Sequence, residues 1–360
     1  MTIVVYIPCE QFEMDALMRE IFPILIIRKP DHSFFFLVTN EEPGWIPNAG
    51  NVTSLVVPFK PQQQILQKWW EFRQLPKLLK QHNASILISA AARYFPKIGL
   101  PQFLLIGDKL GNLTNKNKLK QSSLQKAACI GVLSGFTGKQ LQVNYALNGE
   151  KICTIPVPIL PQPSIIGWQE KEAVKDQQTD GKDFFLYQGT ISPANKIVNL
   201  LKAFSLFKKR QHSNMQLVLA GTLQWPENDF EKKLNTYKFR SDVKIIINPG
   251  RQVQTNLMNA AYALINMNGK PGFSSLQLEA MVSSVPVISV ATEAEPGEGV
   301  ALFADADNPE KIADQMKLLY KDEHLRSELI GKGLEHSKRY DADLSANIFW
   351  ECIEQCIIAH

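Results

Sequence analysis

Residues 263–290 read ALINMNGKPGFSSLQLEAMVSSVPVISV. Two short apolar runs, ALIN (263–266) and VPVISV (285–290), stand on either side of a helical pattern. Apolar runs without alternation indicate strands buried on both faces, and the order strand, helix, strand is typical of a parallel sheet covered by helices. The stretch therefore predicts one repeating unit of an α/β fold.

The helix inside this stretch has a recognisable start. Ser274 is a good N-cap, and Gln277 three residues later predicts a capping box, with Gly272 and Phe273 in the approaching turn. Backbone N–H groups and the positive end of a helix dipole favour phosphate at such a start. Glu279 follows about a turn and a half on, where a carboxylate could accept two hydroxyl hydrogen bonds, as from a ribose. The alternative is a well-capped helix with an exposed Glu279.

The same alternation runs through the whole chain. Apolar β-branched runs occur in both halves, most of them separated by helical patterns, and they are TIVVYIP (2–8), FFFLVT (34–39), SLVVP (54–58), SILIS (85–89), FLLI (103–106), CIGVL (129–133), ICTIP (152–156), FFLYQG (184–189), QLVLAG (216–221) and VKIII (243–247). Ile197, Leu200, Leu201, Phe204 and Phe207 mark the apolar face of a helix. We therefore predict two doubly wound parallel-sheet domains.

Length and composition agree with this organisation. The 360 residues exceed what a single core usually holds, and 45% hydrophobic with 21% charged residues fits an ordinary globular protein. The net charge of +4 predicts no dominant nucleic-acid surface. The five scattered cysteines predict reduced thiols rather than disulfides or a zinc site, with Cys352 and Cys356 in a core-facing stripe. No export signal or run long enough to span a bilayer is expected.

Residues 156–183 are rich in Pro, then in charge and Gly, which favours a hinge. The expected parts are 1–165, a Rossmann-like N-terminal domain, 166–343, a second Rossmann-like domain, and 344–360, a helix that packs back toward the first domain. Two such domains are expected to face one another across a cleft, because ligands of doubly wound sheets bind outside the carboxyl ends of the strands.

Three further turns follow strands of the second half. GTISPANK (189–196) combines a Gly, a Pro and Lys196 before a helix, while AGT (220–222) and PGRQ (249–252) end the next two strands. With the turn before Ser274 they form a rim that suits a nucleotide. The alternative is that these turns have no role in ligand binding, since every doubly wound fold has such turns.

In order and spacing, residues 184 to about 350 resemble the nucleotide-binding domain of retaining group 1 glycosyltransferases of the two-Rossmann (GT-B) architecture, family 4 type. The resemblance runs through YQGTISPANKIVNLLKAF, MQLVLAG, GFSSLQLEAMVSSVPVISV and ALFADADNPEKIADQ. LPKLLKQHNASILIS and KAACIGVLSGFTGKQL follow the N-domain of that family more loosely.

The resemblance implies a nucleoside-diphosphate sugar, UDP- or GDP-linked, bound mainly by the second domain, an acceptor bound by the first, and no cofactor or metal. Glu279 matches the second carboxylate of the E-x7-E motif and would hold the ribose, and Asn248 to Gln252 would edge the base. The residues implied in donor binding are Gly189, Thr190, Asn195, Gly221, Arg251, Gly272, Phe273, Ser274, Ser275, Leu276 and Glu279, with Lys196 and Glu279 in catalytic roles.

This chain departs from the family pattern at charged positions. The first carboxylate of the motif falls on Pro271, the Arg after the first Gly on Thr190, and the Lys six residues after that Gly on Asn195. Lys196 stands one residue late. Lys196, Arg251 or Lys270 would have to supply the positive charge that the departing diphosphate needs.

Two functions are therefore expected. The first is a metal-independent hexosyltransferase of glycan or cell-envelope polysaccharide synthesis that uses a glycan or lipid-linked acceptor, and the alternative is a catalytically weakened homologue that acts as a binding or scaffold protein. The expected location is cytoplasmic, with weak peripheral contact at the inner face of the membrane as an option. That option rests on QQQILQKWWEFRQLPKLLKQH (62–82), a basic segment broken or kinked by Pro76, whose aromatic residues would mostly be core in the favoured reading.

Overall fold

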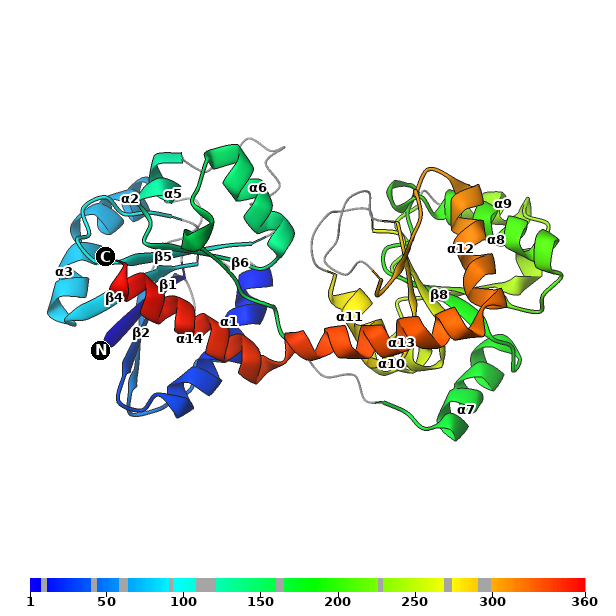
Figure 1. The fold of residues 1–360 in the computed structure, drawn as a ribbon, viewed down its shortest axis with the longest axis horizontal. Helices are drawn as coiled ribbons and strands as arrows, with labels where there is room; N and C mark the ends of the chain where they lie inside the picture. Colours follow the sequence, from blue (N-terminus) through cyan, green and yellow to red (C-terminus); the bar gives the residue numbers. More distant parts are fainter. Residues whose placement is uncertain are drawn as a thin grey trace. The chain divides into compact units, whose positions relative to one another are not determined.

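The computed structural model describes residues 1–7, 12–39, 44–57, 64–90, 93–107, 121–159, 165–225, 229–268, 274–290 and 299–359. Contacts between Cα atoms divide the chain into two compact units. Unit 1 comprises Met1–Pro158 and Arg339–His360, and unit 2 comprises Ile159–Lys338. Each unit is an α/β body with one parallel sheet (Figure 1).

The sheet of unit 1 has seven parallel strands in the order β3-β2-β1-β4-β5-β6-β7. The strands are β1 (Thr2–Ile7), β2 (Ser33–Thr39), β3 (Val52–Val57), β4 (Ala84–Ser89), β5 (Gln102–Ile106), β6 (Cys129–Val132) and β7 (Ile152–Thr154). The helices are α1 (Phe12–Arg28), α2 (Gln64–Arg73), α3 (Leu75–Gln81), α5 (Gln121–Lys126), α6 (Gly135–Tyr145) and α14 (Ala342–Ile358), with a short 3-10 turn at Gly149–Lys151.

Helices α1 and α14 pack together on one face of this sheet, and their side chains share a core with the odd-numbered residues of β1. The rings of Phe22 and Phe349 meet edge to face, with centroids 5.6 Å apart. Phe349 and Cys356 are fully buried, which agrees with the apolar stripe predicted for the last helix. The opposite face of the sheet packs against residues of α3, α5 and α6.

The sheet of unit 2 has six parallel strands in the order β10-β9-β8-β11-β12-β13. The strands are β8 (Phe184–Gln188), β9 (Gln216–Gly221), β10 (Val243–Ile247), β11 (Ala263–Asn266), β12 (Val287–Ser289) and β13 (Leu302–Phe303). The α-helices are α7 (Trp168–Thr179), α8 (Ile197–Gln211), α9 (Asp229–Asn235), α10 (Arg251–Ala260), α11 (Ser275–Val282), α12 (Pro309–Lys321) and α13 (Glu323–Ser337). Short 3-10 turns lie at Pro193–Asn195 and Arg240–Asp242, and a third, Lys338–Tyr340, spans the boundary with unit 1.

The core of unit 2 forms where α8 and α12 cover one face of the sheet. The five apolar residues predicted to face the core from the 197–207 helix are all buried there. Phe185 of β8 packs edge to face on Phe207 of α8, with centroids 5.3 Å apart. Burial of several such aromatic side chains, each contributing about 1.5–3 kcal/mol, fixes α8 and therefore the turn that precedes it.

The linker or hinge expected at residues 156–183 was wrong in part. The boundary between the two units falls inside this stretch, between Pro158 and Ile159. Its second half, however, forms helix α7, whose first turn is held by the Glu170 carboxylate accepting a hydrogen bond from the Gly167 N–H at 2.9 Å. The two-residue strand β13 was not expected, because a run of this length has no periodicity to detect.

Candidate functional site

The carboxyl edge of the unit 2 sheet has a topological switch point. From β8 the chain builds outward through β9 and β10, then returns to place β11 on the other side of β8. Helices α8 and α11 follow β8 and β11, so both begin at this edge, on either side of the switch. Doubly wound sheets bind ligands at such a point, and the N-termini of helices favour anions there.

Gly189 and Gly221 bring the ends of β8 and β9 into close approach. Both have φ of 149°, and a Cβ added to Gly221 would lie 1.8 Å from the Gly189 carbonyl oxygen. The Gly189 N–H donates to the Ala220 carbonyl at 2.9 Å, and the Asn248 N–H donates to the Gly221 carbonyl at 2.8 Å. Glycine is therefore required at both positions, and three of the four predicted turns, those after β8, β9 and β10, form one hydrogen-bonded edge.

Thr190 and Asn195, which occupy the positions of the two expected cations, are tied to each other. The Thr190 carbonyl accepts hydrogen bonds from the Tyr187 hydroxyl at 2.7 Å and from Asn195 Nδ2 at 2.6 Å. Burial raises the pKa of the Tyr187 hydroxyl to about 12, so this donor stays protonated near neutral pH. Neutral hydrogen bonds thus fix the turn after β8 and supply no charge to the rim.

Lys196 has a partner of its own. It stands in the left-handed region with φ of 52° immediately before α8, and its Nζ lies 2.5 Å from Asp307 Oδ2. The side chains of Lys196 and Asp307 are 39% and 70% exposed. Exposed ion pairs contribute only about 0–1 kcal/mol, so a diphosphate could compete for this ammonium. Asp307, in the turn before α12, is the residue that holds Lys196.

Helix α11 begins where the sequence predicts, with Ser274 at the N-cap, but its capping differs. The predicted capping box is wrong: the Ser274 side chain makes no cap hydrogen bond, and Gln277 is buried with its Nε2 donating to Ser289 Oγ at 2.9 Å. Ser289 is the last residue of β12 and is fully buried. Its hydroxyl therefore needs a hydrogen-bond partner, which Gln277 provides.

Only part of the predicted phosphate-binding helix start lies among the residues that the structure describes. Ser275 is exposed and Leu276 half-buried in the first turn, where helix geometry gives the N–H groups no intrahelical acceptor. Gly272 and Phe273, together with Lys270 and Pro271, lie outside the described residues.

Arg251 and Glu279 come together at this edge. Arg251 is the first residue of α10, after an N-cap Gly250, and its Nη2 lies 3.2 Å from Glu279 Oε1. The Glu279 side chain is 14% exposed and that of Arg251 is 53% exposed. The pair places a carboxylate that can accept hydroxyl hydrogen bonds beside a guanidinium that can meet an anion.

Sequence reasoning missed several polar residues of this rim. Gln188 ends β8, and its Nε2 donates to Gln254 Oε1 at 3.1 Å, while Gln254 donates in turn to the Pro249 carbonyl at 2.8 Å. Asn266 ends β11 and accepts from the Asn268 N–H at 3.2 Å. A detectable signal was present, because each of these strands is an apolar run that ends on a polar residue.

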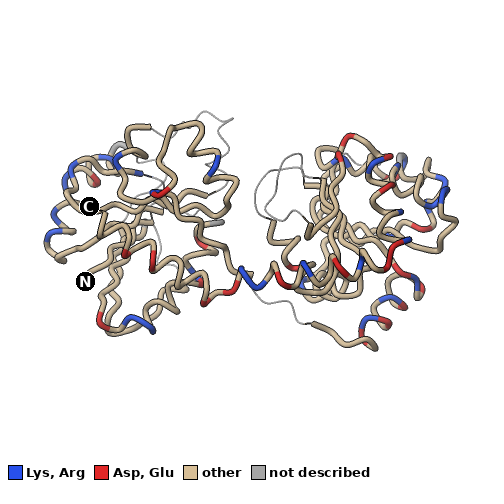
Figure 2. Tube along the Cα trace, in the orientation of Figure 1, with Lys and Arg blue, Asp and Glu red and all other residues tan. Residues whose placement is uncertain are grey.

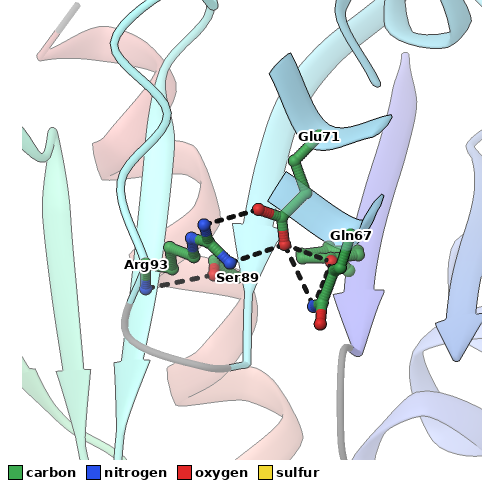
Figure 3. Close-up of polar contacts among 5 residues, drawn as sticks. Gln67, Glu71, Ser89 and Arg93 are labelled. Atoms are coloured by element: carbon green, nitrogen blue, oxygen red, sulfur yellow. Dashed lines mark hydrogen bonds and ion pairs between the residues drawn. The ribbon is translucent and has the colours of Figure 1, made fainter. Parts of the chain in front are cut away.

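The carboxyl edge of the unit 1 sheet carries a second polar cluster that was also missed. The Glu71 carboxylate, 2% exposed, accepts hydrogen bonds from the Tyr6 hydroxyl at 2.7 Å, Gln67 Nε2 at 3.1 Å and Arg93 Nη1 at 2.7 Å. Its other oxygen lies 2.6 Å from Arg93 Nη2. Gln67 and Arg93 approach the carboxylate from two sides (Figure 3). Burial, with the nearby Glu71, raises the pKa of the Tyr6 hydroxyl.

This cluster joins three elements at the switch point of the unit 1 sheet. Tyr6 and Ser89 lie near the ends of β1 and β4, the neighbouring strands between which the chain order reverses, and the Arg93 N–H donates to Ser89 Oγ at 3.3 Å. Gln67 and Glu71 belong to α2. The ion pair therefore fixes the rotation of α2 about its axis.

Two kinds of feature are absent from the described part of the chain. No group of three or more His, Cys, Asp or Glu side chains there could hold a metal ion. Among the same residues, no helix has the length and hydropathy that crossing a membrane requires.

Comparisons with known proteins support the same fold. Residues 169–336 match the family model described as glycosyl transferases group 1, which covers most of unit 2. No curated protein matches the chain.

Solved structures match over nearly the whole length. A glycosyltransferase from Rickettsia africae ESF-5 has 12% identity and a TM-score of 0.71, with 99% of this chain and 98% of that chain covered. Anabaena HepE in complex with UDP has 12% identity and a TM-score of 0.71, with 98% and 100% covered. The apo lipopolysaccharide outer core galactosyltransferase WaaB has 16% identity and a TM-score of 0.69, with 98% and 99% covered. The chain thus has the two-Rossmann GT-B architecture.

Proposed function

We propose that this chain transfers a sugar from a nucleoside-diphosphate sugar to a glycan or lipid-linked acceptor. The observation that carries the proposal is the switch-point edge of unit 2, where the start of α11 and the Arg251–Glu279 pair meet. The group 1 match over this unit and the UDP complex of the structurally similar HepE support a donor of this class. The similarity to WaaB favours a role in the cell envelope.

In this proposal each group of the rim has one task. The first-turn N–H groups of Ser275 and Leu276 bind the diphosphate, and Glu279 accepts hydrogen bonds from the ribose hydroxyls. Arg251, and Lys196 once it leaves Asp307, stabilise the negative charge that develops on the diphosphate as its bond to the anomeric carbon breaks. An acceptor hydroxyl forms the new bond to that carbon and transfers its proton to the departing diphosphate oxygen.

The finer features belong to the same proposal. We assign retention of the anomeric configuration, as in family 4, and catalysis by helix dipoles and cations rather than by a metal. The acceptor is assigned to unit 1, and UDP is the preferred nucleotide because HepE holds it.

A second function, a binding or scaffold protein derived from such an enzyme, has one observation in its favour. Thr190 and Asn195 stand where the family has cations, and the Asn195 side-chain amide donates to the Thr190 backbone carbonyl instead of supplying charge. Two lost charge-assisted hydrogen bonds of about 1.5–3 kcal/mol each would slow transfer by several powers of ten.

A thermal melting screen of the full chain against UDP, GDP, ADP and their sugar conjugates tests the proposal. A nucleoside diphosphate that binds only the folded state raises the melting temperature, and Glu279→Ala should abolish that shift. Glu328→Ala, which removes a surface carboxylate paired with Lys332, is the matched control. If no nucleotide shifts the melting temperature, the scaffold function replaces the transferase.

A further inference from the structure

Helix α2 carries its polar and apolar residues on the opposite sides from those of an ordinary surface helix. Gln67 and Glu71, one turn apart, face the sheet and bind Tyr6 and Arg93. Leu66, Trp69 and Phe72 face outward and are 52%, 57% and 52% exposed. The expectation that these aromatic residues are core is therefore wrong, apart from the half-buried Trp70. The cause is the pairing of the buried Glu71 carboxylate with Arg93, which fixes α2 with its polar side inward.

The outward face forms one apolar surface. Residues three apart on a helix are neighbours, so Leu66, Trp69 and Phe72 make a continuous stripe. Among the side chains whose burial is described, the other large exposed apolar ones on helices of unit 1 lie on α1, α6 and α14, and they are Ile27, Val143, Leu344 and Ile358. Three large side chains on one helix face, two of them aromatic, mark an interaction surface rather than scattered exposure.

Positive charge surrounds this stripe. Residues 64–107 contain six Lys and Arg residues and a single acidic residue, Glu71, which is buried and paired with Arg93. Lys and Arg follow one another along α2 and α3 (Figure 2). The exposed ones are Lys68, Arg73, Lys77, Lys80 and Lys97. The Lys97 ammonium lies 3.6 Å from the centre of the Phe72 ring.

We propose that the stripe of Leu66, Trp69 and Phe72, with its rim of lysine and arginine, docks unit 1 on the surface of an anionic lipid bilayer. Aromatic and leucine side chains enter the boundary between headgroups and acyl chains, while the basic rim stays among anionic headgroups. A protein partner of average surface charge would not account for a rim whose described residues between 64 and 107 include no exposed acidic side chain, whereas an anionic lipid surface does account for it.

The docking deepens the proposed function and in this respect rests on it. Glu71 and Tyr6 connect α2 to the switch point of the unit 1 sheet, where ligands of such sheets bind. A bilayer held by α2 would bring a lipid-linked acceptor close to that edge. The substrate class is then a membrane-borne acceptor rather than a free sugar.

Co-sedimentation of the full chain with vesicles tests the docking without any nucleotide. The probes are phosphatidylcholine vesicles and vesicles with about one third phosphatidylglycerol, each at low and high salt. We expect binding to the anionic vesicles that weakens at high salt. Trp69→Ala with Phe72→Ala should lower the partition coefficient about tenfold or more, and Lys68→Glu with Arg73→Glu should lower it to a similar extent.

Controls separate docking from folding and from donor binding. Ile27→Ala and Val143→Ala remove exposed apolar side chains elsewhere in unit 1 and should leave vesicle binding unchanged. Unchanged melting of each variant, and its unchanged response to UDP, show that folding and the unit 2 site are intact. Absence of binding to anionic vesicles, or equal binding to neutral ones, would overturn the proposal. A dimer in solution that Trp69→Ala dissociates would instead assign this face to a second copy.

Discussion

Arg251 Nη2 and Glu279 Oε1 lie 3.2 Å apart, which joins the first residue of α10 to the middle of α11 at the carboxyl edge of one sheet. The two residues follow different strands, β10 and β11, which stand on opposite sides of β8. Only the doubly wound connection brings them together. Because the Arg251 side chain is 53% exposed, the ion pair contributes little to the free energy of unfolding. We therefore expect the pair to act in ligand binding.

Glu279→Ala should therefore separate binding from stability. We expect UDP affinity to fall about 10-fold to 100-fold, since hydrogen bonds to a charged group contribute about 1.5–3 kcal/mol. The free energy of unfolding should change by no more than about 1 kcal/mol. Calorimetric titration and urea unfolding measure the two quantities. Wild-type affinity in the variant would remove Glu279 from the site.

Lys196 and its partner give a second test. Lys196→Met should weaken UDP binding about tenfold, whereas Asp307→Asn should leave it unchanged or tighten it, because the ammonium no longer has a competing carboxylate. Titration with UDP at constant ionic strength distinguishes the two variants. Should both weaken binding equally, the ion pair would matter for the shape of the turn rather than for charge.

Gly221 tests the close approach of two strand ends. Gly221→Ala places a Cβ against the Gly189 carbonyl in a strained backbone conformation, so we expect a loss of about 3 kcal/mol or more in the free energy of unfolding. Gly250→Ala is the control, since nothing lies within 4 Å of its added Cβ and its φ is −61°. Urea unfolding followed by tryptophan fluorescence reports both. Equal free energies of unfolding for the two variants would contradict the close contact between Gly221 and the Gly189 carbonyl.

Tyr187 predicts a loss of stability at alkaline pH. Burial raises its folded-state pKa to about 12, above the unfolded value near 10, so the stabilisation is complete below pH 10 and is lost as pH rises toward 12. At pH 11 the loss is about 1.4 kcal/mol. Urea unfolding of wild type and Tyr187→Phe at pH 8 and pH 11 measures it. The stability gap between them should narrow at pH 11, and a gap that stays constant would mean that Tyr187 titrates normally.

The strands were predictable because short runs dominated by apolar residues leave a local signature, even in β10, an edge strand in which only Val243 is buried. QLVLAG, VKIII and ALIN are β9, β10 and β11 to the residue, since apolar residues dominate each run and turn residues bound it. The break before Pro76 was predictable for a similar reason: α2 ends at Arg73 and α3 begins at Leu75, with Pro76 in its first turn, where a missing N–H costs nothing.

The polar partners were not predictable, because partners distant in sequence decide them. The spacing of Ser274 and Gln277 fits a capping box, but the Gln277 side chain instead donates a hydrogen bond to the buried hydroxyl of Ser289. Lys196 and Asp307 are 111 residues apart, and nothing local marks either as the partner of the other. Glu71 in particular could not be assigned to the inner face of α2 from a segment whose aromatic residues alone suggested a core.

Hydrogen exchange of the full chain with and without UDP tests the central claim most directly, because it reports where the diphosphate binds. The account predicts slower exchange at Ser275 to Gln277 and in the turns at residues 189–196 and 248–252, with no change in β1 to β7. Slower exchange confined to unit 1, or none at the start of α11, would contradict the assignment of the donor site.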